Sequence, residues 1–135
     1  MRSRLIIGVF ILMAVLGAGA VATTGDGVAP AKQWAAVTFI NAVKVDQMAL
    51  MGPYLIVHDA DKMARGEPCT TFYKFDPKKG PQEAVVTFMC VPVHRKVVNR
   101  TTLTIVSQLN PSDVQTLKEY QFAGDTEGHG VPVSR

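Results

Sequence analysis

The feature that most constrains the fold is a pair of β-prone segments on either side of a turn. Residues 69–75 (CTTFYKF) and 84–91 (AVVTFMCV) are rich in aromatic and β-branched residues, which favour strands. Between them lies DPKKGPQE, with two prolines and one glycine, a composition typical of a hairpin loop. The pattern therefore predicts two antiparallel strands joined by a hairpin.

The register of this hairpin makes a prediction about the two cysteines. A hairpin that is symmetric about Lys79–Gly80 places Cys69 opposite Cys90. Because side chains alternate along a strand, one face then holds the cysteines together with mostly apolar and aromatic residues, and we expect that face to be the core side. The residues on it are Cys69, Thr71, Tyr73, Phe75, Ala84, Val86, Phe88 and Cys90.

The rest of the chain repeats short strand patterns without a long helical period. Strands are predicted over 34–45, 54–58 and 101–109, with a short apolar piece at 48–51 and Pro53 opening the second strand. Residues 59–68 read as a polar loop with room for one helical turn. About seven short strands with turns between them indicate an all-β fold, an antiparallel β-sandwich of immunoglobulin-like or cupredoxin-like type, with a barrel as the related alternative.

The C-terminal part leaves one choice open. Pro111 after Asn110 is typical of a helix start, whereas Leu117, Tyr120 and Phe122 suit a strand. Whether 111–119 is helix or strand stays open, and we favour a turn or short helix followed by a strand over 117–122. The tail, 125–135, contains two glycines and one proline and is predicted to be loop.

The N-terminus has the three parts of a secretory signal peptide. Arg2 and Arg4 precede an apolar run over 5–16, and small residues fill 17–22. We therefore expect a signal peptide over 1–22, cleaved after Ala20 or Ala22, then a flexible lead-in over 23–33 and a single β-sandwich domain over 34–135. The alternative is an uncleaved anchor that tethers the domain to the outer face of a membrane. Either reading predicts a periplasmic or secreted protein.

The charge balance of the expected mature chain argues against nucleic acid as a partner. The full chain has 14 Lys and Arg against 11 Asp and Glu, but two of the arginines lie in the leader, which leaves 12 against 11. The remaining basic residues are scattered, whereas binding to a phosphate backbone needs a clustered basic surface.

Cys69 and Cys90 are the only cysteines in the chain. In an exported chain of this size, two cysteines are most simply a disulfide. A bridge between them closes a loop of about 20 residues, which chain-entropy arguments value at roughly 3 kcal/mol. We therefore expect a stabilising Cys69–Cys90 disulfide.

A metal site is the alternative use of the same region. Cys90 and His94 have C-x3-H spacing after a strand, and His58 ends another strand. This pattern resembles the copper-binding loop of cupredoxins, a resemblance that implies a copper site made by His58, Cys90 and His94. Four methionines are possible soft ligands, although core filling is their common role. They are Met48, Met51, Met63 and Met89.

Enzymatic motifs are lacking in the sequence. There is no G-x-S-x-G elbow and no glycine-rich phosphate loop. Glu127 and His129 in the C-terminal tail are the remaining candidates for a functional pair, because loops often contain functional residues. We therefore predict that the protein is not an enzyme.

Two segments, GPYLIVHD and YQFAGDTEGHGVP, resemble segments of uncharacterised small secreted bacterial proteins. The resemblance implies an exported bacterial β domain without assigning an activity. The sequence thus predicts an exported, non-catalytic domain that binds an unknown protein or envelope partner and needs no cofactor. The alternative is a periplasmic carrier of copper or another metal that uses His58, His94, Cys90 and methionines.

Overall fold

The computed structural model describes residues 31–107 and 114–132. Its elements are β1 (Lys32–Val45), β2 (Met48–Asp59), α2 (Ala60–Ala64), β3 (Thr70–Asp76), β4 (Gly80–Phe88), β5 (Val91–His94), β6 (Thr102–Ser107), β7 (Gln115–Gln121) and β8 (Glu127–Gly130). This arrangement confirms the predicted all-β class and the helical turn within 59–68. In the described part of the chain no helix is long and apolar enough to span a membrane. The expected signal peptide lies outside the described residues and stays a prediction.

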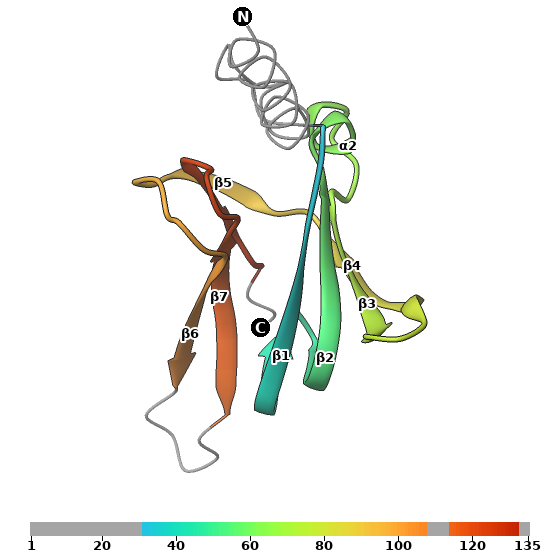
Figure 1. Ribbon diagram of the computed structural model, residues 1–135. Helices are drawn as coiled ribbons and strands as arrows, with labels where there is room; N and C mark the ends of the chain where they lie inside the picture. Colours follow the sequence, from blue (N-terminus) through green and yellow to red (C-terminus); the bar gives the residue numbers. More distant parts are fainter. Residues whose placement is uncertain (1–30, 108–113, 133–135) are drawn as a thin grey trace, which may run out of the picture. The chain divides into compact units, whose positions relative to one another are not determined.

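The strands form two layers that are continuous at one seam. The first layer has the order β4–β3–β2–β1, and the second contains β7 flanked by β6 and β8, with β5 beyond β8 (Figure 1). A short parallel pairing of Val43 and Lys44 in β1 with β7 joins them, while all other pairings between the described strands are antiparallel. The ring of Phe72 on β3 meets that of Tyr120 on β7, with centroids 6.5 Å apart, although these strands are not neighbours in the sheet. The fold is therefore sandwich-like.

The core lies between these layers and is aromatic. Phe39, Phe72, Phe88, Tyr120 and Phe122 are all buried, and Phe72 contacts Phe39, Phe88 and Tyr120. Every second residue of β1 and β2 near this cluster points inward, as the two-residue period of a strand requires. Buried polar residues lie on β7, as Glu119 and Gln121, and at one end of β2, β3 and β8, where the candidate site lies.

The hairpin forms as predicted, but its register differs by one residue near the cysteines and by up to three residues near the turn. Thr70 pairs with Phe88 and Phe72 with Val86, so Thr70 and Phe72 face the core and Thr71 and Tyr73 do not. The reason lies in the turn, where the Asp76 carboxylate accepts hydrogen bonds from the backbone N–H groups of Lys78 and Lys79 and closes the hairpin early. Register irregularities on both sides of Tyr73 then set the face.

Two further predictions about element boundaries were wrong. Pro53 does not open a strand but lies inside β2, opposite Thr38. It is tolerated next to Gly52, whose φ of 101° accompanies the register shift between Phe39 and Val43 in the partner strand. The tail predicted to be loop contains β8, which pairs with both β5 and β7. The strand predicted over 117–122 is confirmed as β7.

Candidate functional site

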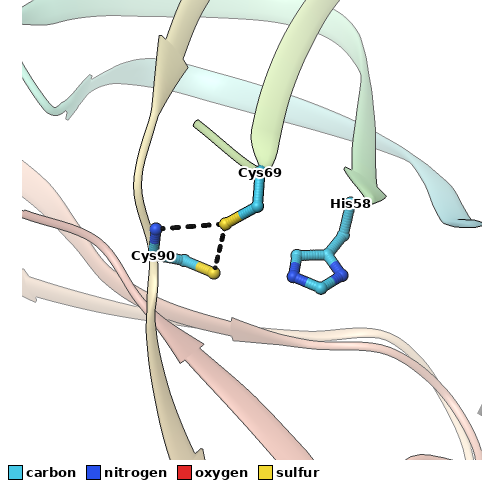
Figure 2. A group of neighbouring side chains, drawn as sticks. All are labelled: His58, Cys69 and Cys90. Atoms are coloured by element: carbon cyan, nitrogen blue, oxygen red, sulfur yellow. Dashed lines mark hydrogen bonds between the residues drawn. The ribbon is translucent and has the colours of Figure 1, made fainter. Parts of the chain in front are cut away.

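Two histidines and two cysteines from four separate places in the chain meet at one end of the core. His58 is near the end of β2, Cys69 directly precedes β3, Cys90 lies between β4 and β5, and His129 is in β8. Backbone hydrogen bonds fix the first three, since Asp59 N–H donates to Cys69 C=O at 2.8 Å and Cys69 N–H donates to Phe88 C=O at 3.2 Å. Figure 2 shows the His58 ring beside the two thiols.

Three of these side chains have donor atoms close enough to share one ligand, and the fourth, His129, lies beside Cys90 and His58. The potential ligand atoms of His58, Cys69 and Cys90 all lie within 4.8 Å of one another. Cys90 Sγ is 3.6 Å from His129 Nδ1, and the His58 and His129 ring centroids are 4.1 Å apart. All four residues are buried, with exposed fractions between 1% and 8%. We call this buried cluster of two sulfurs and two imidazoles the pocket.

The cysteines are free thiols, so the expected disulfide is not present in the structure. Their Sγ atoms are 2.9 Å apart, longer than an S–S bond of about 2.05 Å. The Cys90 backbone N–H points at Cys69 Sγ at 3.3 Å. The prediction was right about the proximity of the two cysteines, because a hairpin brings its ends together. The one-residue register difference places Cys69 and Cys90 beyond the last paired residues, Thr70 and Phe88.

Burial favours the neutral forms of His58, His129 and Cys90. It lowers the pKa of His129 to about 4, with the neighbouring His58 as a second cause, and it also lowers the pKa of His58. Burial likewise raises the pKa of the Cys90 thiol to about 12, with Cys69 adding to the rise. At neutral pH the pocket therefore contains neutral imidazoles and a protonated Cys90.

The imidazoles lack hydrogen-bond partners despite their burial. Both nitrogens of His58 and Nε2 of His129 have none. A buried polar atom without a partner loses its hydration without compensation, which costs about 1–3 kcal/mol. Buried imidazole nitrogens next to thiols are also a common set of ligands for a transition metal.

Two additional side chains border the pocket. Met63 on α2 contacts Cys90, with Sδ 3.9 Å from Sγ, and packs against the core. On another side, Glu127 Oε1 is 3.6 Å from His129 Nδ1, and its side chain is 39% exposed. The ligand atoms of His58, Glu127 and His129 also lie within 4.8 Å of one another. The pocket thus has a thioether neighbour and a carboxylate neighbour.

An ion pair packs against β8 next to His129. Arg95 donates to both carboxylate oxygens of Glu119, at 2.9 and 2.7 Å, and the pair lowers the pKa of Glu119. A Cβ on Gly128 would lie 2.6 Å from Glu119 Oε2. Glycine at this position therefore lets β8 lie against the ion pair while His129, on the alternate face, enters the core.

The structure brings together some of the predicted site residues and not others. His58 and Cys90 belong to the pocket, but His94 does not, because it is exposed on β5 and absent from both clusters of potential ligands. Met48, Met51 and Met89 are 44–64% exposed. Glu127 and His129, predicted as a functional pair in a loop, lie in a strand and meet His58.

Cys69 was missed as a possible metal ligand, and His129 was expected in a loop and not in a strand. A signal for His129 exists in the alternation of Glu127, His129 and Val131 with two glycines, which is a strand pattern with one empty face.

No family model, curated protein or solved structure matches the chain. The resemblance to secreted bacterial proteins therefore stays a prediction, and the function must be inferred from the pocket itself.

Proposed function

We propose that the protein is an exported, non-catalytic domain that binds one transition-metal ion between His58, Cys69, Cys90 and His129. The observation that supports this proposal most is the burial of two imidazoles, three of whose four nitrogens have no partner, beside two free thiols. A metal ion would take one of the two unpartnered His58 nitrogens as a ligand. It would also give a reason for grouping four costly side chains in one place.

The spacing of the donors supports a shared ion. With bonds of about 2.3 Å to sulfur and 2.0 Å to nitrogen, a tetrahedral ion holds a sulfur and a nitrogen about 3.5 Å apart. Cys90 Sγ and His129 Nδ1 are separated by 3.6 Å. Two sulfurs on the same ion stand about 3.8 Å apart. The thiols, at 2.9 Å, would therefore have to separate by about 1 Å on binding the ion.

The chemistry of the pocket favours metal binding over nucleophilic catalysis. A cysteine nucleophile must be ionised and accessible, whereas Cys90 is 8% exposed and burial raises its pKa. A bound cation would replace the thiol protons, so metal binding would release protons to the solvent. The same residues thus suit a buried metal site better than a catalytic dyad.

Metal titration of the reduced protein tests the proposal. Chelator-treated protein, kept under a reductant, is titrated with Co²⁺, Zn²⁺ and Cu⁺, while free thiols are counted. We expect one ion per chain, thiols protected from alkylation, and thiolate-to-cobalt absorption. The double variant Cys69→Ser, Cys90→Ser and the variant His58→Gln should lose binding.

His94→Gln is the matched control, since it removes an exposed histidine outside the pocket. It should bind as the wild type does. The proposal is wrong if the reduced, folded wild type binds none of the three ions, or if the cysteine double variant binds them unchanged.

A further inference from the structure

Met63 lies where a third sulfur could join the pocket. It is on α2, the five-residue helix between β2 and β3, and therefore between His58 and Cys69 in the sequence. None of the α2 residues is fully buried, yet Met63 packs against the core and its Sδ lies 3.9 Å from Cys90 Sγ. This separation agrees with the distance of about 3.8 Å between two sulfurs on one tetrahedral ion.

We infer, on the basis of the proposed function, that the ion is monovalent copper and that Met63 is its thioether ligand at the solvent side of the pocket. Thiolate and thioether sulfurs are soft ligands that select Cu⁺, whereas carboxylates suit harder ions. Cys90 Sγ has Cys69, Met63 and His129 donors within 3.9 Å. An ion near Cys90 would thus have three sulfurs around it, with an imidazole nitrogen of His58 or His129 as its fourth ligand.

The same region also contains a second set of ligands, which would suit a harder ion than Cu⁺. Glu127, with His58 and His129, forms a second set of potential ligands without sulfur, and this set would suit Zn²⁺. The sulfur set is preferred because Cys69 and Cys90 are 3% and 8% exposed, whereas the Glu127 side chain is 39% exposed and open to water. Met63 would therefore be a ligand only in the copper site, and Glu127 only in the zinc site.

Paired variants of the full chain separate these alternatives. Cu⁺ affinity is measured anaerobically by competition with a chromophoric copper(I) chelator, and Zn²⁺ affinity by competition with a zinc indicator. We expect Met63→Leu to weaken Cu⁺ binding about tenfold and to change Zn²⁺ binding less than about twofold. Glu127→Gln should leave Cu⁺ binding unchanged. Met89→Leu is the control, since Met89 is 52% exposed and adjacent to Cys90.

X-ray absorption of the copper-loaded wild type gives a second readout that needs no variant. Three sulfur ligands support the inference, and two sulfurs overturn it. Equal Cu⁺ affinity in Met63→Leu and wild type also overturns it, as does a Cu⁺ affinity that falls in Glu127→Gln instead. If the reduced wild type binds neither Cu⁺ nor Zn²⁺, the proposed function itself is wrong. A site that binds Zn²⁺ but not Cu⁺ refutes only the copper inference.

Discussion

Buried polar groups on β7 differ sharply from the buried histidines a few ångströms away. On β7, Glu119 accepts two hydrogen bonds from Arg95, and the Gln121 amide donates to Lys96 C=O at 2.7 Å and to Asp125 C=O at 2.9 Å. The Tyr120 hydroxyl is hydrogen-bonded to that of Thr70. His129 stacks on the Tyr120 ring at 4.9 Å, yet its Nε2 has no partner, and neither has either nitrogen of His58.

The hydrogen bonds of Glu119, Tyr120 and Gln121 show that this fold can provide partners for buried polar side chains. The only other unpartnered buried side-chain nitrogen or oxygen in the described part of the chain is the hydroxyl of Thr116, near the start of β7 and outside the segment from Glu119 to Gln121. Three of the four unpartnered buried atoms therefore lie at one site, beside two free thiols, and are not spread through the core. Such a concentration is expected where a ligand completes the site.

The largest expected effect is stabilisation by metal. A ligand that binds only the native state adds about 4 kcal/mol to the free energy of unfolding at a thousandfold excess over its Kd. We expect Cu⁺ to raise the stability of the reduced wild type by this order, as measured by denaturant unfolding with and without the ion. The variant Cys69→Ser, Cys90→Ser should show no such gain, while His94→Gln should keep it. If Cu⁺ raised the free energy of unfolding equally in all three proteins, the stabilisation would not come from the pocket.

The second prediction concerns the metal-free protein in acid. The pKa of His129 is about 4 in the folded state and 6.5 in the unfolded chain. Because the unfolded chain binds the proton more tightly, protonation of His129 favours unfolding. The stability associated with neutral His129 is complete above pH 6.5 and is lost as the pH falls towards 4, by about 3 kcal/mol in total. Denaturant unfolding in the presence of a chelator measures this fall.

His129→Gln should flatten that pH dependence, and His94→Gln should not. The His58 pKa is also lowered by burial, so the remaining slope in His129→Gln should belong mainly to His58. A wild-type stability that stays constant between pH 6.5 and 4 would contradict the neutral, buried state of these rings.

The sequence predicts the local hairpin better than the contact between His58 and His129, which are distant in the chain. The hairpin and the proximity of Cys69 to Cys90 follow from neighbouring segments and a turn. The register did not follow, because the Asp76 turn and the irregularities around Tyr73 depend on backbone geometry. His129 was the hardest to place, since β8 reaches His58 only across two layers, and its flanking glycines resembled a loop.

A third prediction compares the two kinds of buried polar residue directly. In the metal-free protein, His58→Leu should leave stability unchanged or raise it by up to about 1 kcal/mol, because it removes two unpartnered nitrogens. Gln121→Leu should instead cost about 1–3 kcal/mol, because it leaves the Lys96 and Asp125 carbonyls unpaired. Urea unfolding of both variants, with a chelator present, measures the difference. Similar losses in the two variants would show that His58 contributes to stability as Gln121 does.

The smallest expected effect connects the two regions through Gly128. A Cβ at this position would lie 2.6 Å from Glu119 Oε2 and 3.1 Å from Arg95 Cγ, so Gly128→Ala must displace either the ion pair or β8. We expect a loss of about 1 kcal/mol in the free energy of unfolding, the lower end of overpacking effects. The loss should shrink when Glu119→Ala is present, since that change removes the crowded carboxylate, and a double-mutant cycle in urea measures this coupling.

If the added methyl group displaces β8, Gly128→Ala also weakens metal binding, because His129 moves with the strand. If only the ion pair moves, metal affinity stays as in the wild type, and the satisfied region on β7 can change without disturbing the pocket.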